Sequence, residues 1–299
     1  MTLISMQTLL ETAKKNKFAV GYFEAWDTYS LEAVAIAAEK EQSPIVLGFG
    51  GLTVNQEWIN GFGIEPLGAY AKQLAKSLSV PAAVYLNEVF EIEHVKRGIK
   101  AGFNSVLLDS SHLSLQENIE ITKKVVKFAH KNDAHVQGEI GILPDFVSDN
   151  KLTNLTDPFI AQDFIENTDI DFLGVSIGNV HLHSKGKYNP DIELLSKINE
   201  QVKIPLVIHG TTGFPEDKIN LAIENGLSMF QVGTIIKETF FNEVKKNIQN
   251  TKIIDNIHKV VGSRKESDFL ESGKNKIIDL ISKYINLFNS QNKKYLYGK

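Results

Sequence analysis

Histidines and carboxylates stand at the ends of several short apolar segments of this 299-residue chain. His209 directly follows the apolar run at 204–208, Glu139 ends another such segment, and His181 closely follows a third. Imidazole and carboxylate groups from separate segments are typical ligands of a divalent cation such as zinc. Such a cation would polarise a carbonyl and stabilise an enediolate, which carbon–carbon cleavage beside a ketone requires. These residues therefore predict a catalytic metal site.

Two short runs of glycine and threonine follow the last two apolar segments. They are GTTG at 210–213, which contains Thr211 and Thr212, and Gly233 with Thr234. Backbone N–H groups and hydroxyls in such runs can surround phosphate oxygens, and phosphate sites are frequent at this position in barrel enzymes. The loop SKGKYNP contributes Lys185 and Lys187. We expect a phosphate-binding site here.

Several of these residues also have a purely structural interpretation. His209 and His181 could be satisfied core histidines, and His183 stands on a loop beside His181. Asp109 could cap the helix that follows it, since Asp favours that position. Structural or surface roles are expected for the remaining histidines outside the predicted mouth, namely His94, His130, His135 and His258.

Eight apolar, β-branched runs alternate with segments of helical periodicity. Strand, helix and strand repeated in this way indicate a (β/α)8 barrel with a parallel sheet. A doubly wound open sheet is the alternative, but no G-x-G-x-x-G motif follows the first run. The predicted strands are 18–23, 44–49, 81–86, 105–109, 135–140, 171–176, 204–210 and 229–233.

In a barrel the carboxyl ends of the strands meet at one mouth, where the loops carry the chemistry. The polar residues therefore gather because of the fold. The residues that the predicted strands deliver to this mouth include Glu24, Asn87, Glu88, Asp109, His112, Glu139, Asn179, His181, His183, His209, Gln231 and Thr234.

The chain from about residue 252 onward predicts helices appended to the barrel. Its stretch IIDLISKYINLF (277–288) is amphipathic and needs an apolar partner, which is either the barrel exterior or a second subunit. No low-complexity linker is present, so we expect a single domain. In it the barrel covers about 5–245 and a helical extension covers about 252–299. A homodimer or tetramer is expected.

Composition excludes several classes of partner and site. The net charge of −4 and the pI of about 6.1 provide no field for nucleic acid or for a membrane surface. No apolar run approaches the roughly 18 residues that span a bilayer. The absence of cysteine excludes disulfides and thiolate metal ligands and fits a reducing cytoplasm.

Five motifs, in this order and spacing, resemble the class II, metal-dependent fructose-bisphosphate aldolases and their tagatose-bisphosphate relatives. The likeness covers about residues 5–245. It implies a TIM barrel, a zinc-type cation, and reversible cleavage of a phosphorylated ketose to dihydroxyacetone phosphate and an aldehyde. The motifs are VLLDSSHLSLQENIEITKKVVKFAH (106–130), GEIG (138–141), GVSIGNVH (174–181), IPLVIHGTTG (204–213) and FQVGT (230–234).

The resemblance also implies roles for individual residues. His181 and His209 match metal-binding histidines, Glu139 matches a glutamate that can approach the metal, and Asp109 matches an acidic residue near the metal pocket. The residues that match groups holding substrate or phosphate are Lys185, Gly210, Thr212, Gln231 and Thr234.

The chain departs from this family after the third predicted strand. Asn87 and Glu88 stand where the family has the Asp that transfers the proton and a third metal-binding His. Asn87 can form hydrogen bonds but cannot take up a proton near neutral pH, whereas Glu88 can still bind a cation. Further departures are Glu24 for Asn, Leu182 for Gly, and Gly233 for a residue that is acidic in some relatives.

Three functions remain open at this point. The first is an active aldolase of altered specificity, in which Glu24, Glu88 or Glu139 moves the proton. The second is a non-catalytic homologue that binds a sugar phosphate or a partner subunit. The third is a barrel isomerase or epimerase that uses the same enediolate.

Overall fold

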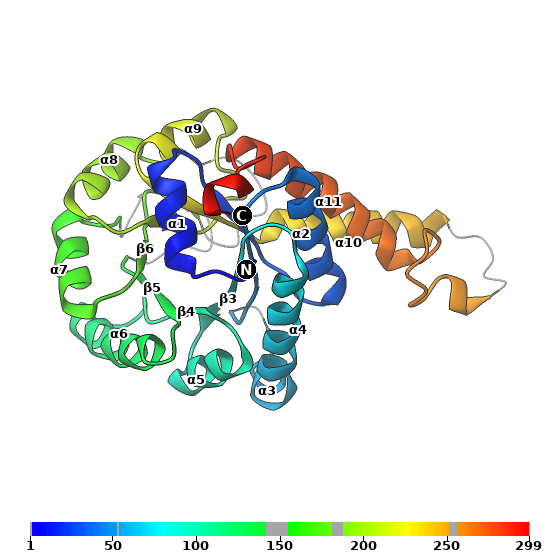
Figure 1. Ribbon diagram of the computed structural model, residues 1–299, viewed down its shortest axis with the longest axis horizontal. Coiled ribbons are helices and arrows are strands. Elements are labelled where there is room, and N and C mark those ends of the chain that lie inside the picture. The colour runs from blue at the N-terminus through cyan, green and yellow to red at the C-terminus, as the bar shows by residue number, and fades with distance from the viewer. Residues whose placement is uncertain (1, 53, 142–154, 181–187, 251–255, 299) are drawn as a thin grey trace.

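Eight parallel strands close into a barrel in the computed structural model, which describes residues 2–52, 54–141, 155–180, 188–250 and 256–298. The strands pair in chain order and β8 pairs with β1, so the predicted (β/α)8 barrel is confirmed. Figure 1 shows the helices around the strands. The strands are β1 (Val20–Phe23), β2 (Ile45–Gly50), β3 (Ala82–Val89), β4 (Ser105–Leu108), β5 (His135–Glu139), β6 (Phe172–Gly174), β7 (Leu206–Ile208) and β8 (Leu227–Val232).

The helices between the strands form the outer layer. Their apolar faces and the outward side chains of the strands form one large core cluster. A three-residue helix α3 (Gln56–Trp58) and a π-helical turn (Ile59–Gly63) precede α4. The other helices of this layer are α2 (Thr28–Glu41), α4 (Ile64–Ser77), α5 (Ile92–Ala101), α6 (Leu115–His130), α7 (Pro158–Thr168), α8 (Ile192–Gln201) and α9 (Glu216–Glu224).

A second apolar cluster fills the inside of the barrel. Successive strand residues point to opposite faces, so Val20 and Tyr22 of β1 belong to the inner cluster while Phe23 belongs to the outer one. Helix α1 (Met6–Lys15) adds Leu9 to the inner cluster and contacts β1, β3 and β8. This apolar filling leaves the carboxyl ends of the strands as the place for inward polar side chains.

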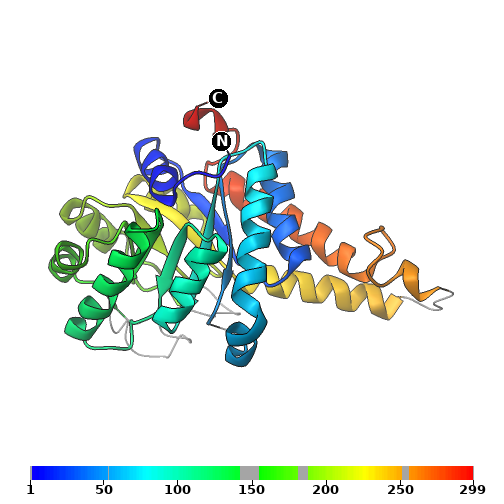
Figure 2. The ribbon, with the colours of Figure 1, turned by 60° about the horizontal axis from the view of Figure 1, so that its bottom comes forward.

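The C-terminal helices α10 (Thr234–Asn250) and α11 (Phe269–Leu287) lie side by side and extend away from the barrel (Figure 2). Helix α11 also packs against α2 and β1 and buries Ile277, Ile281 and Ile285. Arg264, in the connection between α10 and α11, lies 3.6 Å above the ring centre of Tyr29. Of the two partners predicted for the amphipathic stretch, this chain's own barrel exterior therefore buries its apolar face.

The carboxylate of Asp171, whose side chain is only 9% exposed, ties the amino ends of β5 and β6 together. Asp171 Oδ1 lies 3.0 Å from His135 Nδ1, and Asp171 Oδ2 accepts from the backbone N–H of Val136 at 2.7 Å and lies 3.0 Å from His130 Nε2. Burial alone would raise the pKa of Asp171, but these hydrogen bonds outweigh it and hold the pKa below its usual value.

We expect Asp171→Asn to lower the free energy of unfolding at pH 7 by about 1–2 kcal/mol. Because the folded-state pKa lies below the unfolded value of about 3.9, the carboxylate stabilises the fold above that value. This contribution is lost as the pH falls through the folded-state pKa. Urea titrations from pH 7 down to pH 3 measure the difference. Asp169→Asn is the matched control, since that side chain is 92% exposed and 3.9 Å from His130. A difference that fails to shrink between pH 4 and pH 3 would contradict the assignment.

Candidate active site

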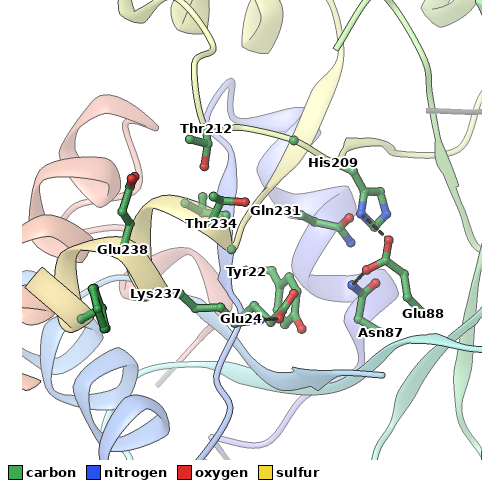
Figure 3. A pocket seen from close by; sticks show the side chains of 14 residues that line it. Tyr22, Glu24, Asn87, Glu88, His209, Thr212, Gln231, Thr234, Lys237 and Glu238 are labelled. Carbon is green, nitrogen blue, oxygen red and sulfur yellow. Dashed lines mark hydrogen bonds and ion pairs between the residues drawn. The ribbon is translucent and has the colours of Figure 1, made fainter. Parts of the chain in front are cut away.

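A pocket of about 580 Å³ opens at the carboxyl ends of β1, β3, β7 and β8, beside the first turns of α10 (Figure 3). Most of the predicted site residues that the structure describes lie on its wall. The predicted residues that line it are Glu24, Asn87, Glu88, His209, Gly210, Thr212, Gln231, Gly233 and Thr234. Tyr22, Lys237, Glu238 and Phe241 also line it and were missed from the sequence.

His209 is buried between two carboxylates. Its Nε2 lies 2.5 Å from Glu139 Oε1 and its Nδ1 lies 3.3 Å from Glu88 Oε1. The side chain of His209 is 4% exposed. Asn179, also buried, donates through Nδ2 to the His209 carbonyl at 3.0 Å and so joins the β6 and β7 loops.

The two carboxylates make this point of the mouth strongly attractive to positive charge. Burial by itself lowers the pKa of His209, but the charges of Glu139 and Glu88, with a smaller share from Asp109, raise it to about 9. Without a metal ion, an imidazolium therefore provides the positive charge near neutral pH. A divalent cation could provide it instead.

Glu88 reaches the pocket because the end of β3 is irregular. In a regular strand Asn87 and Glu88 would point to opposite faces. The register with β4 shifts between Leu86 and Val89, and Glu88 has φ of 51°, in the left-handed region. As a result both side chains face the mouth, and Asn87 Nδ2 donates to Glu88 Oε2 at 2.7 Å (Figure 3). Backbone strain of this kind in a buried non-glycine residue is concentrated at functional sites.

A chain of buried polar side chains lies beneath the pocket. Gln137 Nε2 donates to Glu139 Oε1 at 2.8 Å, while Gln137 Oε1 accepts from the Tyr85 hydroxyl at 2.7 Å and from Gln231 Nε2 at 3.0 Å. Sequence reasoning missed Gln137 and Tyr85. Gln137 stands two residues before Glu139, and Tyr85 stands two residues before Asn87, so within each strand the two side chains point to the same inward face. This spacing of polar groups on otherwise apolar strands was the signal that could have revealed them.

Glu24 forms an ion pair with Lys237 of α10 across the pocket wall. Two glycines make room for its carboxylate. A Cβ on Gly50 would lie 2.9 Å from Glu24 Oε2, and a Cβ on Gly233 would lie 3.3 Å from the same oxygen. Lys237 had no signal in the sequence, since it stands in the first turns of an ordinary amphipathic helix.

The glycine–threonine loop after β7 is held to β8 and α10. Thr211 is buried and donates through its hydroxyl to the Gln231 carbonyl at 2.8 Å, so its side chain faces away from the pocket. Thr212 lines the pocket and accepts from the backbone N–H of Ile235 at 3.1 Å. Gly210 has φ of 70° and accepts from the Tyr188 hydroxyl.

The other predicted site residues lie elsewhere or outside the described residues. Asp109 Oδ1 accepts from Ser111, and the N-cap of α6 is Ser114, so the helix-capping alternative for Asp109 is wrong. His112 is exposed. The residues outside the described part of the chain are His181, Leu182, His183, Lys185 and Lys187.

The donor set at the mouth fits a divalent cation in its chemistry. An imidazole and two carboxylates, from Glu88 and Glu139, converge at one negatively charged point. Within the described ranges, no three His, Cys, Asp or Glu side chains are already spaced to share one ion. In these ranges the carboxylates contact the imidazole nitrogens themselves, and the second histidine that the sequence predicted is among the residues not described.

The structure is thus a parallel (β/α)8 barrel with a cluster of histidine and carboxylate side chains at the carboxyl ends of its strands. The sequence profile of class II fructose-bisphosphate aldolase matches residues 4–293. The fructose-bisphosphate aldolase of Geobacillus stearothermophilus is 31% identical over 271 residues, which cover 89% of this chain and 93% of that protein. The same figures hold for the fructose-bisphosphate aldolase of Staphylococcus epidermidis. The chain therefore belongs to the class II fructose-bisphosphate aldolase family.

Solved structures show the same fold. The YdjI aldolase of Escherichia coli K12 matches with a TM-score of 0.82 at 24% identity, covering 98% of this chain and 99% of that one. The fructose-bisphosphate aldolase of Campylobacter jejuni matches with a TM-score of 0.79 at 21% identity and covers 97% of each chain. Among the described residues, no helix has the length and apolarity needed to cross a membrane.

Proposed function

We propose that this protein is a metal-dependent aldolase that cleaves or forms a phosphorylated ketose, with dihydroxyacetone phosphate and an aldehyde as products. The observation that carries the proposal is the placement of His209 between Glu88 and Glu139 beside the pocket. Membership of the aldolase family supports it. The departure at Asn87 and Glu88 favours a specificity that differs from that of the fructose-bisphosphate enzymes.

His209, Glu88 and Glu139 would hold the metal ion, together with His181 from the part of the chain that is not described. We propose zinc because imidazole and carboxylate are ligands that it prefers. When bound, the cation would polarise the ketone and stabilise negative charge beside it.

The phosphate of the substrate would lie at the opposite end of the pocket from His209, where Thr212 and Thr234 lie (Figure 3). Gly210 and Gly233 line the pocket there, and α10 begins at the same wall with Thr234, so the positive end of its helix dipole lies beside the pocket. We propose that Thr212, Thr234 and the backbone of Gly210 and Gly233 bind the phosphate, with Lys185 as a further candidate.

Glu24 is our candidate for the proton transfer that Asn87 cannot perform. Glu139 does not line the pocket, and Glu88 already contacts both His209 and Asn87. Glu24 lines the pocket, where its carboxylate forms an ion pair with Lys237, and a carboxylate can act as a general base.

The test is release of dihydroxyacetone phosphate from a panel of ketose phosphates, before and after treatment with EDTA and after addition of zinc. We expect cleavage of at least one member, loss of activity with the chelator, and recovery with the metal. A non-catalytic sugar-phosphate-binding homologue is the second candidate, which the amide at Asn87 favours. Zinc and substrate binding without turnover across the panel would establish that candidate instead.

We expect the double change Asn87→Asp and Glu88→His to raise fructose 1,6-bisphosphate cleavage by roughly 10- to 100-fold, because a positioned acid–base group typically contributes 10²–10⁴-fold. Histidine is among the residues that tolerate the left-handed backbone of position 88. The measurement is kcat/KM for the bisphosphate, and Asn87→Asp alone is the control. A double variant that is no better than the parent would show that other residues set the specificity.

A homo-oligomer is also proposed. Large apolar side chains are exposed along α10 and the connection to α11, with Phe241 62%, Ile248 55% and Val261 50% exposed. A second copy of the chain is a suitable partner for them. Light scattering at several protein concentrations tests this.

The cysteine-free composition supports a cytoplasmic location, and the packing of α11 on the barrel supports a single domain.

A further inference from the structure

Three buried polar atoms around the pocket have no hydrogen-bond partner within the described part of the chain. They are the Tyr22 hydroxyl, Asn87 Oδ1 and Gln231 Oε1. The three residues line the pocket, yet each is at most 4% exposed. A buried polar atom without a partner is costly, so such atoms call for a ligand that supplies the missing hydrogen bonds.

Hydrogen bonds to neighbouring carboxylate and amide groups determine which atom of each side-chain amide, the nitrogen or the oxygen, has no partner. Asn87 Nδ2 donates to Glu88 Oε2 at 2.7 Å, so Asn87 must turn its oxygen the other way. Gln231 Nε2 donates to Gln137 Oε1 at 3.0 Å, which leaves Gln231 Oε1 over. Both unpartnered amide atoms are therefore acceptors.

Unpartnered acceptors distinguish a sugar end that carries hydroxyl groups from one that carries a phosphate. A hydroxyl of a neutral polyol can donate to Asn87 Oδ1 and Gln231 Oε1, and can donate to or accept from Tyr22. A phosphate dianion has no proton to donate, so it would leave both amide oxygens unsatisfied and would add repulsion.

The charges on the pocket wall act in the same direction. Glu24, Glu88 and Glu238 line the pocket, Glu88 faces the imidazole of His209, and Lys237 is the single lysine or arginine among the described lining residues. Lys237 already forms an ion pair with Glu24. One phosphate has a place at the glycine–threonine end, but a second would face carboxylates. Juxtaposed like charges of this kind are strongly unfavourable.

We infer that the pocket selects a ketose with one phosphate and an uncharged polyhydroxylated end, rather than a ketose bisphosphate. This inference rests on the proposed aldolase function for its substrate, and it names the class of that substrate. Tyr22, Asn87 and Gln231 are then specificity-determining residues for the neutral end.

Isothermal titration with non-cleavable ligands tests the inference separately from catalysis. A hexitol 1-phosphate and the corresponding hexitol 1,6-bisphosphate lack the carbonyl, so neither can be cleaved. We expect the zinc-loaded protein to bind the monophosphate roughly 10- to 100-fold more tightly. Equal or tighter binding of the bisphosphate would overturn the inference. If the monophosphate is preferred but no ketose phosphate is cleaved, the aldolase function fails and the ligand class stands.

Tyr22→Phe removes the hydroxyl, one of the three unpartnered polar atoms, and keeps the aromatic ring. It should weaken binding of the hexitol 1-phosphate by roughly 5- to 10-fold, the value of one hydrogen bond, and leave binding of inorganic phosphate unchanged. Tyr295→Phe is the matched control, because that side chain is 68% exposed and outside the pocket lining. An equal loss for both ligands, or no loss for the hexitol 1-phosphate, would contradict the assignment.

Discussion

His209→Ala is expected to abolish ketose phosphate cleavage, with kcat/KM falling by at least roughly 10³-fold. The imidazole is the proposed metal ligand that the structure places directly between two carboxylates. Its removal takes away the imidazole that both the buried Glu88 and the half-buried Glu139 contact. We therefore also expect the free energy of unfolding of the metal-free protein to fall by about 3–5 kcal/mol, as for a broken buried ion pair.

Two further variants separate the chemical effect from the structural one. His209→Ala combined with Glu88→Gln removes one of the repelling charges, so stability should recover in part while cleavage stays lost. His258→Ala changes an exposed histidine outside the barrel and should alter neither property. Chemical denaturation, zinc titration and the cleavage assay provide the readouts. Full activity in His209→Ala would remove the basis of the metal-dependent mechanism.

Gly210→Ala is expected to have the second-largest effect. The residue has φ of 70°, and an added Cβ would lie 2.1 Å from the carbonyl oxygen of Val180, far inside van der Waals contact. Neither atom is at the end of a flexible side chain, so the loop after β7 must shift. We expect a loss of about 2–4 kcal/mol in unfolding free energy. We also expect at least roughly tenfold weaker binding of inorganic phosphate, because Thr212 would move with the loop.

Gly262→Ala is a matched control for the backbone term. Gly262 has the same φ of 70°, but nothing lies within 4 Å of its added Cβ. This substitution should lower the free energy of unfolding by about 1 kcal/mol, the cost of placing alanine in the left-handed conformation. It should leave phosphate binding unchanged. Equal destabilisation by the two substitutions would show that the contact with Val180 is unimportant.

The strand positions could be predicted because apolar β-branched runs between amphipathic helices leave a closed parallel barrel as the favoured way to bury them. The site could be predicted in outline for the same reason. Once the strands are placed, their carboxyl ends must meet, so Glu24, Glu139 and His209 fall at one mouth. Thr211 shows the limit of this reasoning, since the sequence cannot tell which of two adjacent threonines turns its hydroxyl inward.

Some features of the site depend on contacts between residues far apart in the chain. The unpartnered acceptor of Gln231 depends on Gln137, which lies 94 positions away along the chain. The pair of Glu24 and Lys237 joins the first strand to the last helix of the barrel, 213 positions apart. Pairings of this kind arise only when the chain folds, because neither residue type predicts its partner.

The sequence by itself determined the barrel, the end of it that carries chemistry, and the types of groups available there. The tertiary structure decided how those groups are aimed. Strand periodicity would send Asn87 and Glu88 to opposite faces, and only the register shift and the left-handed backbone at Glu88 bring both into the pocket. Periodicity is a local property of the chain. A bulge depends on how neighbouring strands fit when the barrel closes.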